Sequence, residues 1–407
     1  MHMPPDAASN DILKRESATV LLWARLAPER WPLPLNKLPQ GTALVGGAVR
    51  DGLLNRLSAT PDLDLVVPQN ALGLTRRLAQ ELNGTCVVLD ADRDMARLVL
   101  GEWTVDLSRR EGADLNADLQ RRDYTVNAIA LPLHPRGIVV DPSGGLEDLQ
   151  RMTLRAIQEQ NLIDDPLRLL RGLRFMAEQN LSLDPDAATW IHRHRHRLPE
   201  VAPERILSEL QRLVCGAWAA AVIPELQRLD LLAPWQSSDP IPWDLPDTGA
   251  DADFSQEERQ LAWPLLRLTH LVSEEGLKQL RSSRRLAHRS RQLRHWLRCW
   301  REQINEAERL QLQSDLEEDL PAFILTLPQT DRITWLRRWR DPEDKLFHPR
   351  TPLNGRMLQE QLGLVPGPSL GMLIDHLRLE YAFGRIVDQD DALQSARHWL
   401  TKNRSML

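Results

Sequence analysis

Residues 60–67 read Thr-Pro-Asp-Leu-Asp-Leu-Val-Val, and this stretch decides the fold. Apolar and β-branched residues that follow a proline predict a β-strand. Side chains alternate between the two faces of a strand, so we expect Asp62 and Asp64 to point the same way. Neighbouring carboxylates repel each other unless a cation lies between them, and Mg²⁺ is a hard cation that takes such oxygen ligands. The alternative is that both lie at a solvated strand end.

A glycine pair precedes this strand. Residues 43–51 read Ala-Leu-Val-Gly-Gly-Ala-Val-Arg-Asp, which predicts a strand, a turn at Gly46 and Gly47, and a helix over Ala48–Leu57. Glycines at such a turn let backbone N–H groups approach a phosphate. Arg50 falls in the first helical turn, where its charge opposes the helix dipole unless an anion binds there. The alternative is that the glycines serve only a tight turn.

Composition limits the possible functions. The chain has 407 residues, of which 42% are hydrophobic, and a net charge of −6. This length predicts two to four domains. No apolar run reaches the length of a membrane span, and the first ten residues lack a signal-peptide pattern. The three cysteines (Cys86, Cys215 and Cys299) are odd in number and far apart, which predicts reduced thiols in the cytoplasm rather than disulfides or a zinc site.

Strand and helix patterns alternate up to about residue 155. Residues 87–89, 98–100 and 103–107 are predicted strands, and Asp106 is either a third acid beside the first two or a solvated edge residue. Arg122 and Asp123 then offer a donor fork next to an acceptor. These groups suit a triphosphate and a ribose hydroxyl, although a surface ion pair is the simpler alternative.

A second informative stretch, Asp-Asp-Pro-Leu-Arg, lies at residues 164–168. Pro166 fits the first position of a helix and Asp165 fits its N-cap, so capping is one interpretation of Asp165. Three arginines then recur at every third position: Arg168, Arg171 and Arg174. Arginines along one ridge repel one another unless anions bind them, and Asp165 shares a helix face with Arg168.

A basic run extends from Arg281 to Arg301, with eight arginines and no acidic residue. Its apolar spacing predicts an amphipathic helix. The charged face is either a solvated surface or a site for an RNA backbone, where positive charge supplies affinity. The candidate RNA contacts are Arg284, Arg285 and Arg291.

Four strings carry a family resemblance. They are GGAVRD at 46–51, DLDLVV at 62–67, RRDYTVNA at 121–128 and DDPLR at 164–168. All resemble the family of tRNA nucleotidyltransferases and bacterial poly(A) polymerases. The resemblance extends over nearly the whole chain after residue 40 and is most specific before residue 225.

The resemblance implies an α/β fold followed by helices. The N-terminal head is expected to be polymerase-β-like, with a mixed sheet and helices, and the neck, body and tail are expected to be all-helical. The implied domains are an N-terminal extension (1–40), the head (41–155), a neck with base recognition (156–225), a body (226–310) and a tRNA-binding tail (311–407).

The resemblance also implies an activity. A tRNA 3′ end would receive nucleotides from CTP or ATP, with Mg²⁺ and without a template or a membrane. Asp62 and Asp64 would be the catalytic metal ligands. The implied nucleotide-binding residues are Gly46, Gly47, Arg50, Arg122, Asp123, Asp165, Arg168, Arg171 and Arg174. Asp164 replaces the glutamate that the family usually has, but the implied base-reading residues are Asp165 and Arg168.

The nucleotides added depend on residues 108–120. In family members that add the terminal adenosine, this segment carries a flexible loop, and here it is shorter by about ten residues and has no proline. We therefore predict a CC-adding enzyme. The alternatives are a complete CCA-adding enzyme or a poly(A) polymerase, and, less favoured, a non-catalytic RNA-binding protein or a nucleotidyltransferase acting on small molecules.

Overall fold

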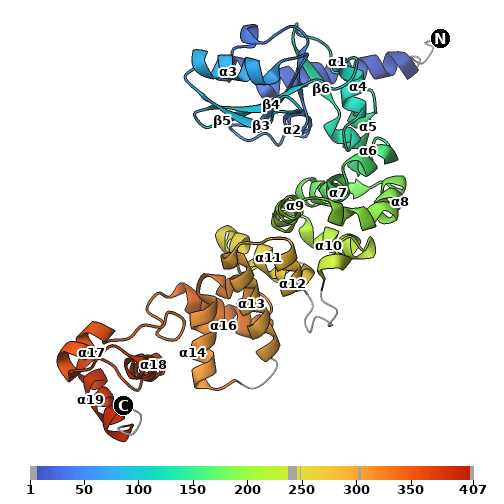
Figure 1. Ribbon diagram of the computed structural model, residues 1–407. Helices are drawn as coiled ribbons and strands as arrows, with labels where there is room; N and C mark the ends of the chain where they lie inside the picture. Colours follow the sequence, from blue (N-terminus) through green and yellow to red (C-terminus); the bar gives the residue numbers. More distant parts are fainter. Residues whose placement is uncertain (1–6, 237–244, 248, 301–303, 404–407) are drawn as a thin grey trace. The chain divides into compact units, whose positions relative to one another are not determined.

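The computed structural model describes residues 7–236, 245–247, 249–300 and 304–403 (Figure 1). Arg301, the last residue of the basic run, lies outside this part. The chain divides into two compact units, Met1–Ala202 with Ala217–Leu231 and Pro203–Gly216 with Leu232–Leu407. The predicted α/β head followed by helices is confirmed, while the predicted boundaries of extension, head, neck, body and tail stay a prediction.

A six-stranded mixed sheet forms the centre of the first unit, in the order β3-β4-β5-β2-β1-β6. Its strands are β1 (Thr42–Val45), β2 (Leu63–Val67), β3 (Thr85–Asp90), β4 (Met95–Leu100), β5 (Trp103–Arg109) and β6 (Ala130–His134). Only β2 and β5 pair in parallel; the other neighbours are antiparallel. Strand β2 is hydrogen-bonded on both edges and its Leu63, Leu65, Val66 and Val67 are buried, so it is a rigid base for the acidic residues.

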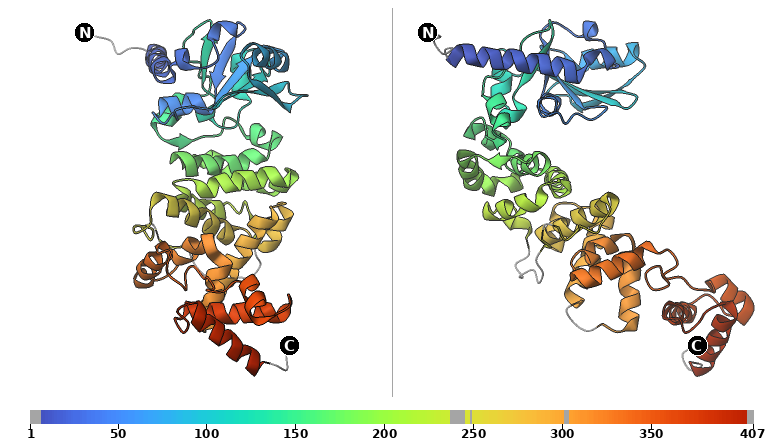
Figure 2. Two further views of the ribbon diagram at one scale, coloured as in Figure 1. Left: turned by 90° about the vertical axis from the view of Figure 1, so that its left-hand side faces the viewer. Right: turned by 180° about the vertical axis from the view of Figure 1, so that it is seen from behind.

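Helices surround the sheet and continue the first unit (Figures 1 and 2). They are α1 (Ala7–Leu26), α2 (Gly47–Leu53), α3 (Ala71–Glu81), α4 (Leu115–Gln120), α5 (Gly145–Gln150), α6 (Glu159–Asp164), α7 (Leu167–Gln179), α8 (Pro185–His194) and α10 (Ala219–Arg228). Helix α3 packs against β3, β4 and β5. Two short strands, β7 (Thr153–Leu154) and β8 (Ser182–Leu183), form a separate parallel pair.

Helix α2 is shorter than predicted. It ends at Leu53 rather than Leu57, because Asn55 takes a positive φ of 58° that an α-helix does not allow. Arg25 of α1 donates to the carbonyls of Gly52 and Leu53 at 2.8 and 3.0 Å. These bonds satisfy acceptors that the end of a helix leaves without partners.

Among its described residues, the second unit contains helices and their connections, with no strand. Its helices are α9 (Pro203–Cys215), α11 (Gln256–Leu271), α12 (Glu274–Gln279), α13 (Arg284–Cys299), α14 (Glu306–Leu316), α15 (Leu320–Ile324), α16 (Gln329–Arg340), α17 (Gly355–Leu362), α18 (Pro368–Ala382) and α19 (Gln389–Lys402). One core gathers around the buried Phe323 and a second joins α17, α18 and α19. Among the described residues, no helix is both long and apolar enough to span a bilayer.

Candidate functional site

The two predicted acids lie at the start of the central strand. Asp64 is the second residue of β2 and is half-buried, while Asp62 directly precedes the strand and is exposed. The hydroxyl of Thr104 in β5 donates to a carboxylate oxygen of Asp62. Asp64 is thus held in a paired strand, while Asp62 is held by the side chain of Thr104.

Asp106 lies beside Asp64 in the neighbouring strand, because the parallel register pairs these two residues. Its two oxygens accept from Nε and Nη2 of Arg97 at 2.7 and 2.9 Å. Asp106 is therefore a third acid beside the first two and not a solvated edge residue, and both of its oxygens are engaged by Arg97.

The electrostatics of Asp64 differ from those of its neighbours. Burial, and next the charges of Asp106 and Asp62, raise the pKa of Asp64 to about 6, although Arg122 and Arg171 act in the opposite direction. A carboxylate with a raised pKa is short of positive charge. A bound cation would correct that shortage.

The donor set fits Mg²⁺. Among the described residues, no three His, Cys, Asp or Glu side chains come together as a more complete metal site. Mg²⁺ is commonly bound by one or two protein carboxylates, with water and substrate phosphates as its other ligands. Asp62 and Asp64 provide the two carboxylates and would hold the ion.

The glycine turn touches this acid pair. Gly46 joins β1 to α2 with a φ of +72°, and a Cβ placed on it would lie 2.9 Å from Oδ2 of Asp64. Any side chain at this position would meet the carboxylate and strain the backbone. Gly47 follows as the first residue of α2. The backbone of the turn therefore packs closely against the Asp64 carboxylate, which only a glycine allows.

Arg50 already has partners in this structure. It is 6% exposed, donates to both oxygens of Asp51 at 2.8 and 3.1 Å, and donates through Nη1 to Oδ1 of Asn127 at 2.7 Å. Asp51 thus balances the positive charge of Arg50, for which the sequence predicted a bound phosphate. The nucleotide-binding role of Arg50 stays a prediction.

Three predicted arginines gather around one aromatic ring. The guanidinium carbons of Arg50, Arg171 and Arg174 lie 5.6, 5.4 and 4.2 Å from the ring centroid of Phe175, which is buried. The face of an aromatic ring attracts such cations. Arg174 is also paired with Glu178 at 3.1 Å. The structure therefore brings together residues from α2 and α7 that are far apart in sequence.

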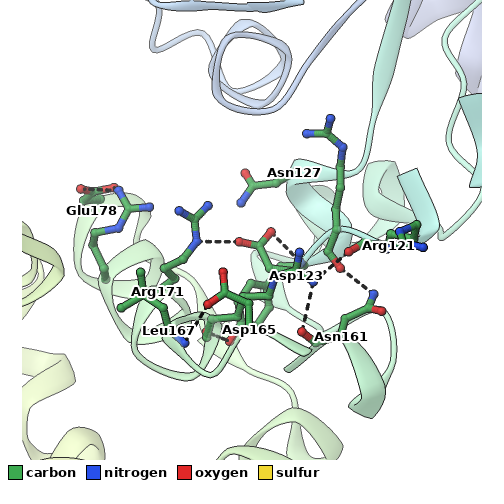
Figure 3. A network of polar contacts seen from close by, with 12 residues as sticks. Arg121, Asp123, Asn127, Asn161, Asp165, Leu167, Arg171 and Glu178 are labelled. Atoms are coloured by element: carbon green, nitrogen blue, oxygen red, sulfur yellow. Dashed lines mark hydrogen bonds and ion pairs between the residues drawn. The ribbon is translucent and has the colours of Figure 1, made fainter. Parts of the chain in front are cut away.

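Arg122 and Asp123 are both held by neighbouring charges, and Figure 3 shows the contact between Asp123 and Arg171. Arg122 donates to Oδ2 of the buried Asp118 at 3.1 Å, and Arg171 donates to Oδ2 of Asp123 at 2.9 Å. Burial alone would raise the pKa of Asp123, but Arg171 and Arg168 outweigh this effect and hold the pKa below its ordinary value. Asp123 is thus fixed as a charged acceptor.

The predicted base-reading residues lie at the start of α7. The helix begins at Leu167, and Pro166 rather than Asp165 is its N-cap, one residue later than predicted. Oδ1 of Asp165 accepts from the backbone N–H of Leu167 at 3.2 Å, so Asp165 does help to cap the helix. Arg168 donates through Nη1 to the carbonyls of Arg121 and Asn161.

Sequence reasoning missed several residues of this network, namely Asn127, Asn161, Asp118 and Phe175. Asp118 lies four residues before Arg122, a spacing that favours an ion pair on a helix. Asn127 lies inside the string RRDYTVNA. Nothing in the sequence singles out Asn161, because its partners are backbone carbonyls about 40 positions earlier.

Most of the described arginines in the basic run have partners within the second unit. Four of its arginines form ion pairs with acids from other elements: Arg281 with Glu204, Arg285 with Glu318, Arg289 with Asp319 and Arg291 with Glu274. Arg294 is buried and donates to two carbonyls, those of Thr269 and Val272. Arg284 is exposed, with no ion pair among the described residues. The RNA-binding roles of Arg284, Arg285 and Arg291 stay predictions.

Comparisons with known proteins agree with this geometry. Residues 102–155 match the family model "Poly A polymerase head domain", and residues 180–237 match "Probable RNA and SrmB-binding site of polymerase A". A CC-adding tRNA nucleotidyltransferase of Synechocystis is 31% identical over 400 residues, which cover 90% of this chain and 95% of the relative. An A-adding tRNA nucleotidyltransferase of Deinococcus radiodurans is 41% identical over 204 residues, 49% of this chain and 46% of the relative.

A solved structure shares the fold. It is the Thermotoga maritima CCA-adding enzyme complexed with tRNA, with a TM-score of 0.69 and 22% identity over 94% of this chain and 98% of the other. The sheet, the glycine turn and the acid pair, together with these relatives, define a nucleotidyltransferase. Within that class of enzymes, the chain belongs to the family of CC-adding and CCA-adding tRNA nucleotidyltransferases.

Proposed function

We propose that this enzyme adds two cytidines, and no adenosine, to the 3′ end of tRNA. The observation that carries the proposal is the short connection between β5 and α4, which consists only of residues 110–114. In family members that add the terminal adenosine, this connection holds a flexible loop that helps the base pocket change from cytosine to adenine. A connection this short leaves little chain to act as a lever.

Hydrogen bonds also hold the connection at both of its ends. The N–H of Arg110 donates to the carbonyl of Val67 at 2.7 Å, and Oδ1 of Asp114 accepts from the N–H of Ala117 as the N-cap of α4. Gly112, the hinge that the sequence suggested, has a φ of +86°. Its missing Cβ would lie 2.8 Å from that of Ala117, so the turn is closely packed.

The middle of the connection is tied to α4 and the residue after it. The N–H of Glu111 donates to Oδ1 of Asp118 at 2.8 Å, and the Glu111 side chain pairs with Arg121 at 3.1 Å. Because Asp118 also holds Arg122, a movement of the connection would disturb the proposed nucleotide-binding residues. This arrangement favours one fixed pocket.

The chemistry follows from the acid pair. The 3′-hydroxyl of the tRNA would attack the α-phosphate of CTP in line, and pyrophosphate would leave. Mg²⁺ bound by Asp62 and Asp64 would favour the attacking alkoxide and neutralise charge on the leaving group. Arg122 would bind the triphosphate and Asp123 the ribose.

Base selection would depend on Asp165 and Arg168. A carboxylate next to a guanidinium matches the amino donor and ring-nitrogen acceptor of cytosine, and adenine has the same order. Uracil and guanine have the reverse order and would leave buried groups unpaired. Arg168 uses Nη1 for backbone carbonyls, and the described residues leave its Nε and Nη2 available to a base.

Three tRNA substrates test the proposal: tRNA ending at the discriminator base, at the first C, and at CC. Each is incubated with Mg²⁺ and CTP, ATP or both. We expect two cytidines on the first substrate, one on the second and none on the third, with no adenosine on any. Efficient addition of adenosine to the CC-ending tRNA would overturn the CC-adding assignment in favour of a CCA-adding or A-adding enzyme.

A further inference from the structure

Asn161 is a buried residue of α6 and only 2% exposed. Its Nδ2 donates to the carbonyls of Gln120 and Arg122, at 2.8 and 2.7 Å, and its Oδ1 accepts from Nε2 of Gln158 at 2.8 Å. Both amide hydrogens and the amide oxygen therefore have partners. A buried amide with all these bonds holds its surroundings in one arrangement.

Arg168 binds the carbonyl between these two. Its Nη1 donates to the carbonyl of Arg121 at 2.8 Å and to the main-chain carbonyl of Asn161 at 3.1 Å. The Asn161 side chain therefore binds the same backbone segment as Arg168, and the Asn161 main chain accepts from the Arg168 guanidinium.

The next carbonyl is held in the same way. The N–H of Ile157 donates to the carbonyl of Asp123 at 3.2 Å. Four consecutive carbonyls, those of residues 120–123, thus accept hydrogen bonds from residues 157–168. These bonds replace the pairing that a sheet or helix would supply to the same backbone. We name this set of bonds the carbonyl bracket.

The carbonyl bracket joins the two halves of the proposed nucleotide site. One side carries Arg122 and Asp123, which would bind the triphosphate and ribose. The other side carries Asp165 and Arg168, which would read the base. Small errors in the distance between these two halves weaken the preference for the correct nucleotide, because the polar groups no longer meet their partners.

We propose that Asn161 is a positioning residue for cytosine selection: it fixes the base-reading side chains relative to the sugar- and phosphate-binding ones. The inference rests on the proposed function, because it takes CTP as the nucleotide that occupies the site. Asn161 itself does not touch the nucleotide in this account. It acts through the backbone of residues 120–122 and through Arg168.

The chain offers a graded set of variants. Asn161→Leu removes the amide at similar volume, and Asn161→Asp keeps the shape but loses both donors. Gln158→Leu removes only the bond to Oδ1 of Asn161 from an exposed position. Gln160→Leu is the matched control, since its exposed amide bonds to Asp164 within the same helix at 2.7 Å.

Each variant is assayed with tRNA ending at the discriminator base, and its unfolding midpoint is recorded. For Asn161→Leu and Asn161→Asp we expect KM for CTP to rise about tenfold, the preference for CTP over UTP to fall about tenfold, and kcat to change less than about threefold. CTP binding without tRNA, measured by calorimetry, should weaken in proportion. Gln158→Leu should change in the same direction by less, and Gln160→Leu should match the wild type.

Two failures are distinguishable. If the wild type adds no cytidine to any tRNA, the proposed function is wrong. If the wild type adds cytidine, and folded Asn161 variants keep its KM, CTP affinity and base preference, the positioning role is wrong. Should both Asn161 variants unfold, Gln158→Leu decides, and an unchanged base preference in that folded variant overturns the inference.

Discussion

Two acids of the first unit, Asp64 and Asp123, have opposite electrostatic surroundings. Asp64 lies near Asp62 and Asp106, and its pKa is raised to about 6. Asp123 is more deeply buried, yet Arg171 and Arg168 hold its pKa below the ordinary value. The protein therefore balances the charge of Asp123 itself and leaves Asp64 short of positive charge. We interpret Asp123 as a prebuilt hydrogen-bond acceptor and Asp64 as part of a site that needs a bound cation.

The largest expected effect follows from removal of the carboxylate of Asp62 or of Asp64, where the protein leaves negative charge unbalanced. Asp62→Asn and Asp64→Asn should each slow cytidine addition about a thousandfold, since the ion would lose a charged ligand. Single-turnover assays with saturating tRNA and CTP measure this loss. Asp90→Asn is the control, because that acid lies at the end of β3, where it accepts from the backbone N–H of Arg93 at 3.0 Å and its ion pair with Arg93 is long, at 3.8 Å. A loss below tenfold in both site variants would contradict the metal role.

Removal of the Asp123 carboxylate, whose charge the protein balances, should reduce the stability of the fold. Asp123→Asn removes the buried carboxylate that pairs with Arg171, and we expect a loss of about 2–3 kcal/mol in the free energy of unfolding at pH 7. Because the pKa of Asp123 is lowered in the folded state, this contribution exists above the unfolded pKa and disappears as pH falls. Urea unfolding at pH 7 and at acidic pH measures both.

The control for Asp123 is Asp164→Asn, an exposed acid that accepts from Gln160. It should alter stability by less than about 0.5 kcal/mol. Equal stability of Asp123→Asn and the wild type at pH 7 would show that the ion pair with Arg171 contributes little.

Replacement of Asp64 should have the opposite effect on the free energy of unfolding. A raised folded-state pKa means that the charged carboxylate destabilises the metal-free protein, progressively as pH rises from about 4 to about 6. In EDTA, Asp64→Asn should therefore be more stable than the wild type by about 1–2 kcal/mol at pH 8, after allowance for solvent screening. The difference should vanish near pH 4. A destabilised Asp64→Asn at pH 8 in EDTA would contradict this account.

The smallest effects belong to α13, in which Arg285, Arg289 and Arg291 form ion pairs with acids. Arg284→Glu should weaken tRNA binding about threefold and lower its salt dependence, because Arg284 is exposed and has no ion pair among the described residues. Arg291→Glu should weaken binding less, since Arg291 is already paired with Glu274 at 3.0 Å. Filter binding at several salt concentrations compares them. An equal effect of both substitutions would show that the ion pair does not limit Arg291.

The sequence predicts best where a feature is local. Apolar and β-branched residues predicted the strand within residues 60–67, and the glycine pair predicted the turn at Gly46. The sequence left two alternatives open for Asp106, because Asp106 meets Asp64 only through the parallel register of β2 and β5. The partners of the basic run were also hidden, since Asp319 and Glu204 lie in other elements.

The predicted end of α2 was wrong for a related reason. The apolar spacing after Gly47 extends to Leu57, but the turn at Asn55 and the contacts from Arg25 end α2 at Leu53. Asn161 was invisible because a side chain that binds distant backbone carbonyls leaves no pattern in the residues around it. Tertiary contacts of this kind override local propensity.

One measurement tests the contrast between Asp64 and Asp123 most directly. It is the titration of the Asp64 carboxyl carbon, followed by NMR in EDTA and assigned by comparison with Asp64→Asn. We predict a midpoint near pH 6, because burial and the neighbouring acids favour the protonated form. Added Mg²⁺ should move the midpoint to lower pH, since the ion binds the charged form. A midpoint near pH 4 that Mg²⁺ does not change would contradict the account.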